Sequence, residues 1–187
     1  MKKTLCTLLM GLCFTMNANA QVTVAEPQFA EETILLTSDT EGITLKRENA
    51  SIKTKVGASV FLVGIGKAKS RVTLAGIKSI NSTPAPRNAR LIIKAKDNDT
   101  DPNSFISIFK FELTKKERRY QVAEAGTFTG SKANSAAQVD FSAEKYGNQS
   151  YLIQLRDLEP GEYGIMLGDP NTANTKNGLK VTTFTVN

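Results

Sequence analysis

The sequence predicts an all-β protein, a Greek-key (immunoglobulin-like) β-sandwich. Three observations lead to this fold class. Short segments of alternating polar and apolar residues are separated by turns rich in glycine, proline and asparagine. No amphipathic segment of helical period is longer than about two turns. A Pro-Gly turn runs directly into a tyrosine, as in the tyrosine corner of Greek-key sandwiches.

Residues 1–20 have the pattern of a secretory signal peptide. Lys2 and Lys3 precede an apolar run, and Ala18-Asn19-Ala20 supplies the small residues of a cleavage site. The apolar run is too short to cross a bilayer, and no later segment approaches that length. We therefore expect cleavage before Gln21, export to the periplasm or the cell surface, and no membrane span.

Both cysteines, Cys6 and Cys13, lie in this leader, so the mature chain folds without a disulfide. Cys13 follows a leucine, whereas a lipoprotein signal has a small residue there, so removal of the leader is favoured over lipidation. Cleavage would leave 167 of the 187 residues, a length that suits one domain, residues 21–187. The formal net charge would fall from +6 to about +4. This mild basicity argues against nucleic-acid binding.

The chain contains no histidine, and its mature part contains no cysteine. It therefore lacks the side chains most often used as general base, metal ligand and soft nucleophile. Histidine triads and the usual zinc sites are excluded.

The first strands follow from local patterns. Thr33–Thr37 and Ile43–Arg47 flank a glycine-containing loop and predict a hairpin, and the segment 22–48 is a candidate appendage to the sandwich. In residues 51–56 the alternation places Ile52 inside and the lysines in solvent. Residues 60–65 are nearly all apolar, which indicates a strand covered on both faces.

The second half of the chain continues this pattern. Phe105–Leu113 is the most hydrophobic segment, and we expect it to be a central strand with Phe109, Phe111 and Leu113 on one face. Lys115–Arg119 predicts a charged hairpin turn, and Gly130–Gln138 a loop. The other predicted strands are Arg71–Leu74, Arg90–Lys96, Tyr120–Ala125, Val139–Lys145, Tyr151–Arg156, Tyr163–Leu167 and Lys180–Val186. The total of roughly nine to eleven short strands is typical of a sandwich.

The most specific local pattern is Leu158-Glu159-Pro160-Gly161-Glu162-Tyr163. In a tyrosine corner Leu158 would fill the core, Pro160 and Gly161 would make the turn, and the Tyr163 hydroxyl would bond to the backbone just upstream. These residues are therefore predicted to have a structural role rather than to contact a ligand.

With its leader, this corner and the segments Val63–Ser70 and Ala125–Lys132, the chain resembles uncharacterised exported β-sandwich proteins of Gram-negative gut anaerobes. The resemblance would cover most of the mature chain. It implies export but no activity, so no catalytic residue is carried over from it.

Asp97, Asp99 and Asp101 have the spacing with which calcium loops often begin. Pro102 and Ile108 stand where an EF-hand has glycine and glutamate, so the loop is not an EF-hand. An Asx-rich turn is the favoured interpretation, and a calcium site completed by other loops is the alternative. No other cofactor is predicted.

Other patterns carry less weight. Ser142–Lys145 matches Ser-x-x-Lys but falls in a predicted strand, and Gly64–Lys67 lacks the residues that a phosphate loop needs. Several basic residues could share one sheet face as a positive patch, although ordinary solvated strand faces explain them better. They are Lys53, Lys55, Arg90, Lys94, Lys96 and Lys110.

Two functions of different classes fit these observations. The favoured one is a non-catalytic binding or interaction module of the cell envelope, with an envelope protein or a glycan as partner, working through end loops or edge-strand addition. The alternative is a histidine-free hydrolase of glycan or peptide, which needs a pocket with two carboxyls, one of raised pKa. Without tryptophan, sugar stacking would depend on Tyr120, Tyr146 and Tyr151.

Overall fold

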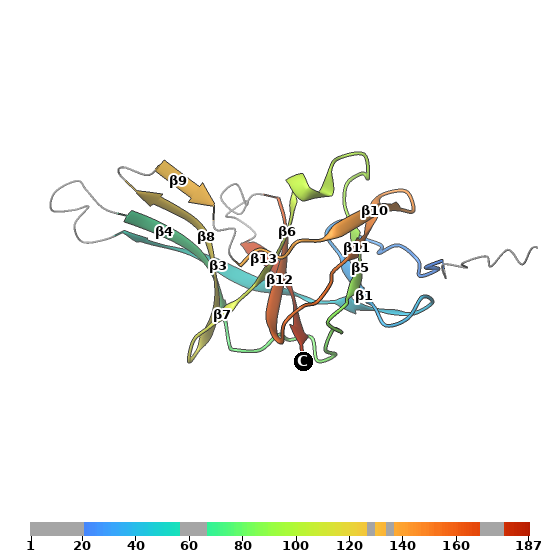
Figure 1. Ribbon diagram of the computed structural model, residues 1–187, viewed down its shortest axis with the longest axis horizontal. Coiled ribbons are helices and arrows are strands. Elements are labelled where there is room, and N and C mark those ends of the chain that lie inside the picture. Colours follow the sequence, from blue (N-terminus) through green and yellow to red (C-terminus); the bar gives the residue numbers. More distant parts are fainter. Residues whose placement is uncertain (1–20, 57–66, 127–129, 134–136, 169–177) are drawn as a thin grey trace, which may run out of the picture.

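The computed structural model describes residues 21–56, 67–126, 130–133, 137–168 and 178–187. Within these ranges it contains thirteen β-strands and one short 3-10 turn, η1 (Pro102–Ser104). The predicted all-β class is confirmed, and the strands form two antiparallel sheets (Figure 1). The predicted leader and the predicted strand 60–65 lie outside the described residues. Among the residues that are described, no helix is long and apolar enough to span a membrane.

The smaller sheet has the strand order β10-β11-β5-β1-β2. Its strands are β1 (Thr33–Leu36), β2 (Gly42–Leu45), β5 (Arg90–Lys94), β10 (Ser142–Tyr146) and β11 (Ser150–Gln154). The predicted first hairpin is present, with Leu35 opposite Ile43. It is not an appendage, because β1 also pairs with β5 and all of its residues are buried.

The larger sheet has the strand order β6-β12-β13-β3-β4-β8-β7. Its strands are β3 (Arg47–Val56), β4 (Lys67–Ala75), β6 (Ile106–Lys110), β7 (Glu112–Leu113), β8 (Glu117–Gly126), β12 (Gly161–Leu167) and β13 (Leu179–Val186), and β9 (Gly130–Ala133) pairs with β8. The two ends of this path, β6 and β7, are separated in the chain by Phe111 alone. The sheet therefore curls back on itself and is nearly barrel-like.

One hydrophobic core lies between the two sheets. The smaller sheet contributes Leu35, Leu91, Ile93, Tyr151 and Ile153, and the larger sheet contributes Ile106, Ile108, Tyr163, Ile165 and Phe184. The rings of Tyr163 and Phe184 stack with their centroids 5.3 Å apart. Two pleated layers thus bury their inner faces against each other, which is the main source of stability for the described residues, since these include no cysteine.

A second core lies inside the curl of the larger sheet. Its buried members are Val72, Leu74, Phe109, Phe111, Tyr120, Met166 and Val181. Successive residues of a strand point to opposite faces, so β6 gives Ile108 to the first core and Phe109 to the second. Phe109 stacks on Tyr120 with ring centroids 3.8 Å apart. Gly164 makes room for this ring, since a Cβ atom there would lie 2.6 Å from Phe109.

The chain passes from the smaller to the larger sheet between β2 and β3, at Lys46. The Asn81 side chain accepts from the Lys46 N–H at 2.9 Å and donates to the Lys46 carbonyl at 3.0 Å. It also donates to the Thr183 carbonyl of β13 at 2.8 Å. The amide therefore replaces the strand partner that the backbone lacks at the crossing.

Residues 21–26 cover the outer face of the smaller sheet. Val22 and Val24 pack on a cluster formed by Ile34, Leu36, Ile92 and Leu152. The Glu26 carboxylate accepts the N–H groups of Asn148 and Gln149 at 2.5 and 3.1 Å and the Ser150 hydroxyl at 2.7 Å. Because both faces of β1 are covered, its sequence is nearly continuously apolar.

The prediction that Phe105–Leu113 is one central strand is wrong. The segment is broken at Phe111, and β6 lies at one end of the path through the larger sheet. Phe109 and Phe111 are buried, but Leu113 is 51% exposed, because the break carries β7 to the other end of the path. The apolar character of β6 arises from its place between two cores.

Two predictions for the outer strands of the larger sheet are also wrong. Ile52 is 41% exposed although the alternation places it inside. It lies opposite Val72 of the second core, but Ala50 is the β3 residue that packs against this core, and from there β3 projects with β4 and β8 (Figure 1). The predicted loop 130–138 contains β9, which pairs with β8. Backbone pairing needs no apolar side chains, so the small polar residues of β9 gave no strand signal.

Candidate functional site

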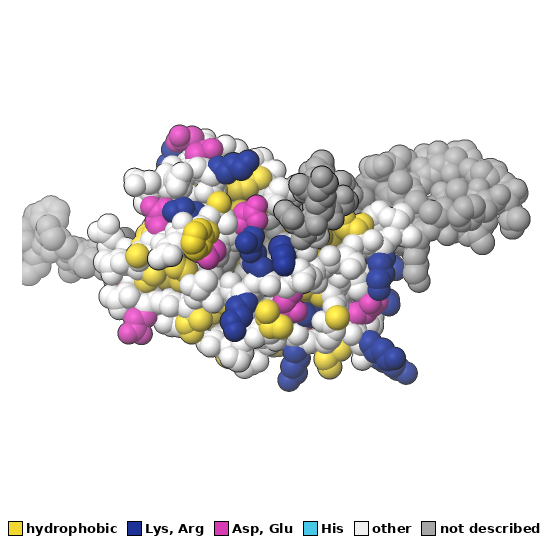
Figure 2. All heavy atoms as spheres, turned by 180° about the vertical axis from the view of Figure 1, so that it is seen from behind, with side chains coloured by type: hydrophobic (Ala, Val, Ile, Leu, Met, Phe, Trp, Pro, Cys, Tyr) yellow, Lys and Arg dark blue, Asp and Glu magenta, His cyan; other side chains and the backbone are white. Residues whose placement is uncertain are grey.

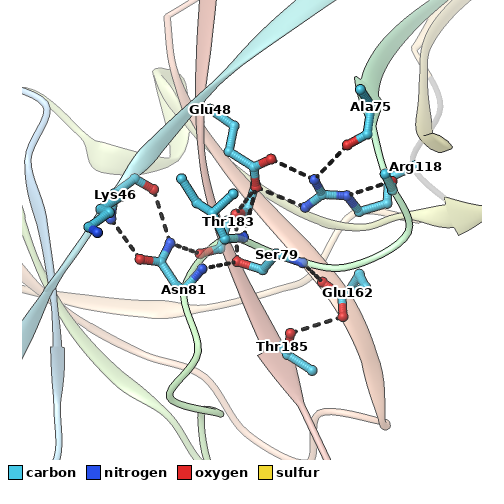
Figure 3. A network of polar contacts seen from close by, with 11 residues as sticks. Lys46, Glu48, Ala75, Ser79, Asn81, Arg118, Glu162, Thr183 and Thr185 are labelled. Atoms are coloured by element: carbon cyan, nitrogen blue, oxygen red, sulfur yellow. Dashed lines mark hydrogen bonds and ion pairs between the residues drawn. The ribbon is translucent and has the colours of Figure 1, made fainter.

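A buried polar network joins β3, β8 and the segment after β4 (Figure 3). The Arg118 side chain is fully buried and donates two hydrogen bonds to the Glu48 carboxylate, at 3.0 and 2.6 Å. It also donates to the carbonyls of Ala75 and Gly76, both at 3.3 Å. A bidentate pair of this kind holds both planar groups in one orientation, so it fixes the end of β4 against β8.

The same network reaches β13 and β12. The Thr183 hydroxyl donates to Glu48 at 2.5 Å and lies 2.7 Å from the Ser79 hydroxyl, while the Ser79 N–H donates to Glu162 at 2.7 Å. Burial alone would raise the pKa of Glu48, but the hydrogen bonds from Arg118 and Thr183 and the charge of Arg118 outweigh it, and the pKa is lowered. Because its acids accept hydrogen bonds from the protein itself, we assign this network a structural role.

The sequence did not reveal this network. The hairpin turn predicted at Lys115–Arg119 exists, with the Thr114 N–H bonded to the Glu117 carbonyl at 3.0 Å, but Arg118 is not part of a solvated loop. Glu48 and Arg118 are 70 positions apart, so no local pattern connects them.

The predicted tyrosine-corner residues lie where the chain crosses from β11 in the smaller sheet to β12 in the larger one. The Tyr163 hydroxyl donates to the Glu159 carbonyl at 2.6 Å, and Tyr163 is only 2% exposed. Leu158 is buried in the first core, Pro160 is exposed in the turn, and Gly161 begins β12. The Tyr163 hydroxyl thus forms its hydrogen bond inside the protein, in keeping with the structural role predicted for it.

The three aspartates of the proposed calcium loop have separate partners. Asp97 accepts the Asp99 N–H at 3.1 Å, Asp99 pairs with Lys145 at 2.6 Å, and Asp101 caps η1 through the Asn103 N–H at 3.0 Å. Among the described residues, no three His, Cys, Asp or Glu side chains are placed to hold one metal ion. Asx turns account for this loop, and calcium binding stays a prediction that calorimetric titration can test.

A cavity of about 350 Å³ opens at the end of the two sheets, next to this loop. Its apolar wall is formed by Ala30, Ala95, Phe105 and Leu167, and its other lining residues are Glu31, Lys96, Asp97, Thr100 and Gly168. They come from the segment before β1, the loop between β5 and β6, and the end of β12. The Phe105 ring meets Tyr151 edge to face, with centroids 5.9 Å apart. An apolar wall with a few polar groups at its edge is typical of a small-ligand site.

The two carboxylates beside this cavity are already engaged. Glu31 pairs with Arg47 at 2.6 Å, and Asp97 accepts the backbone N–H of Asp99. A hydrolase that works with two carboxyls needs one of them to have a raised pKa. Each of these two carboxylates is engaged by its own neighbour, and the two are not hydrogen-bonded to each other.

The displaced carboxyl pKa values in the described part of the chain are lowered. Burial would raise the pKa of Glu26 and Glu48, but hydrogen bonds outweigh it. For Asp99, Glu117 and Glu159 a hydrogen bond from a lysine lowers the pKa. These groups are stabilised as carboxylates, which does not suit a general acid.

A second groove, of about 520 Å³, runs beside the tyrosine corner. Glu112, Asp157 and Glu159 line it together with Lys110 and Arg156. Lys110 pairs with Glu159 at 2.7 Å, so part of the charge in the groove is neutralised by a contact within the protein. Its other lining residues include Phe111, Val139 and the corner residues Leu158 and Tyr163. The hydrogen bond from Lys110 lowers the pKa of Glu159, which does not suit a general acid.

Other candidate residues are used elsewhere in the fold. Tyr120 and Tyr151 are buried and Tyr146 bonds to the Val24 carbonyl, so these rings form no open platform for sugars. Ser142 and Lys145 lie three positions apart on β10 and hence on opposite faces of the strand. The six basic residues of the proposed patch are divided between β3 and β6 in one sheet and β5 with its following loop in the other, so they do not share one face.

No protein-family model matches this chain, and none of the curated proteins is similar to it.

Proposed function

We propose that this protein is a non-catalytic binding module, exported to the periplasm or the cell surface, that receives an apolar group of an envelope partner in its end cavity. The observation that carries the proposal is the apolar wall of Ala30, Ala95, Phe105 and Leu167 around a space of about 350 Å³. That volume suits one large side chain or a small ring. The apolar wall favours an envelope protein over a glycan, because sugars need many hydrogen-bonding partners.

We further propose that the strands have an immunoglobulin-like arrangement, which would favour binding at this end of the sandwich. The order β1-β5-β11-β10 corresponds to the A, B, E and D strands of that fold, and β6-β12-β13 corresponds to C, F and G. The Tyr163 corner between β11 and β12 then has the place of the E–F corner. Under this correspondence the cavity belongs to the B–C and F–G loops, which variable domains use for binding.

The proposal can be tested by NMR titration with small probes. We expect N-acetyl-leucinamide or N-acetyl-phenylalaninamide to shift the amide signals of residues 95–100 and 167–168, and N-acetylglucosamine to shift them less. Ala30 is an exposed residue of the cavity wall, so Ala30→Trp should fill the cavity without disturbing the core and should abolish the shifts.

Ala75→Trp provides the matched control, because Ala75 is also exposed but lies at the end of β4, away from the cavity. The control should leave the probe-induced shifts unchanged. If neither amide probe perturbs the cavity residues, or if Ala30→Trp keeps the full response, the cavity is not the binding site.

A further inference from the structure

Three large aliphatic side chains are exposed at the opposite end of the molecule from the cavity. Ile77, Ile80 and Leu113 are 47%, 53% and 51% exposed. The Gly76 N–H donates to the Lys116 carbonyl at 2.9 Å, so the segment after β4 lies beside the β7–β8 hairpin. Both run along the lower side of the molecule in Figure 1, whereas η1 and the loop that lines the cavity lie at the top. We call residues 76–80 and 112–117 the basal surface.

Lysines accompany the aliphatic side chains of the basal surface. Lys78, Lys115 and Lys116 are exposed, and none of them forms an ion pair with a residue that the structure describes. Figure 2 shows basic and hydrophobic side chains next to one another along the lower right edge, where this end of the molecule lies in that view.

The acidic residues of the basal surface offset little of this positive charge. Glu117 is held between Lys53 at 2.9 Å and Arg119 at 2.5 Å. Glu112 is the other acid of the basal surface, and it is exposed. The three lysines therefore leave an excess of positive charge around the exposed isoleucines and leucine.

From this combination we propose that the basal surface binds peripherally to an anionic phospholipid membrane. Ile77, Ile80 and Leu113 enter the headgroup region, and the lysines contact lipid phosphates, each lysine adding about fivefold to the affinity. Aliphatic side chains on loop tips need no partner of matching shape, whereas a stable protein interface needs about 800 Å² of complementary surface on each side. Binding in this orientation turns the end cavity away from the membrane (Figure 1).

Vesicle co-sedimentation of the purified protein tests this proposal, independently of what the cavity binds. We expect binding to equimolar phosphatidylglycerol and phosphatidylcholine at low salt, weaker binding as salt rises, and little binding to phosphatidylcholine alone. The double substitution Lys115→Glu/Lys116→Glu should lower the affinity by about tenfold or more. Lys145→Glu/Lys180→Glu makes the same change of charge at exposed positions elsewhere and should leave the affinity within about twofold of the wild-type value.

A second pair of variants tests the aliphatic side chains without a change of charge. Ile77→Ser/Ile80→Ser should weaken vesicle binding several-fold, while Phe29→Ser/Ile43→Ser, at other exposed apolar positions, should not. All four replaced side chains are on the surface, so each variant should keep the wild-type circular dichroism spectrum.

Three results would overturn the proposal. The first is the absence of binding to the anionic vesicles. The second is equal binding by the wild-type protein and both basal variants. The third is tight binding of soluble heparin that is lost in Lys115→Glu/Lys116→Glu but kept in Ile77→Ser/Ile80→Ser, which would identify the basal surface as a site for soluble polyanions.

Discussion

Replacing Arg118 with methionine is expected to destabilise the protein by about 3–5 kcal/mol, because the substitution leaves Glu48 buried without its ionic partner. The Glu48 side chain is 11% exposed and accepts hydrogen bonds of 3.0 and 2.6 Å from Arg118. Methionine fills much of the space of the arginine stem, so the loss comes mainly from charge and hydrogen bonding. For a domain of this size such a loss corresponds to a fall in melting temperature of about 10 °C.

The double variant Glu48→Met/Arg118→Met provides the control, since it removes both charges together. It should recover much of the lost free energy of unfolding, because apolar residues of similar volume often replace a buried ion pair at little cost. Urea unfolding followed by far-UV circular dichroism measures the full cycle and suits a chain without tryptophan. An Arg118→Met variant within about 1 kcal/mol of wild type would refute the reasoning, and so would a double variant no more stable than the single one.

The pH dependence of the same variants gives a further check. The pKa of Glu48 is lowered in the folded protein, so its contribution is present above the unfolded-state value of 4.5 and is lost as the pH falls through the folded value. In Arg118→Met, burial without a partner should raise the pKa of Glu48, so protonation stabilises that variant. The difference in stability between wild type and variant should therefore narrow as the pH falls, first through the raised pKa of Glu48 in the variant and then below 4.5, where the wild type loses stability.

Three other predictions concern single contacts. Tyr163→Phe should lower the free energy of unfolding by about 1–2 kcal/mol, measured by urea titration, because the Glu159 carbonyl loses its hydrogen-bond donor; an unchanged midpoint would argue against a corner that holds the crossing. Gly164→Ala should cost about 1–3 kcal/mol and alter the near-UV circular dichroism, since the new methyl group would lie 2.6 Å from the Phe109 ring; a variant as stable as wild type would mean that the second core is loosely packed. Glu26→Gln should speed amide hydrogen exchange in the turn after β10 with little change in global stability. Because the pKa of Glu26 is lowered, with burial opposing hydrogen bonds that outweigh it, the wild-type turn should open in the same way as the pH falls below 4.5. Exchange rates equal to those of wild type would contradict this assignment.

Structural features that depend only on residues close together in the sequence could be predicted. The first hairpin has strands close in sequence, and its glycine-containing turn marks the reversal between them. The corner at Tyr163 needs only the five residues that end at the tyrosine, because its hydrogen bond reaches back to Glu159. Alternation and turn residues therefore sufficed for the all-β class and for the sites of many strands.

Predictions failed where distant residues decide the environment. The alternation of polar and apolar residues shows which residues share one face of a strand, but not whether another layer packs on that face. Ile52 was therefore expected to be buried, and β6 was expected at the centre of a sheet. The charge of Arg118 predicted a solvent-exposed side chain. Its buried partner, Glu48, is too far away in the sequence for any local pattern to connect the two residues.

The candidate site likewise combines features that follow from the local sequence with features that depend on distant residues. The sequence by itself determined the absence of histidine, the short alternating strands and the loops from which a binding site could be built. Only the tertiary structure brought Ala30, Ala95, Phe105 and Leu167 around one cavity, since they come from three separate segments whose meeting depends on how the two sheets pack. The physical reason is that local patterns record the preferences of the backbone over a few residues, whereas a cavity and a buried ion pair are properties of the space between sheets.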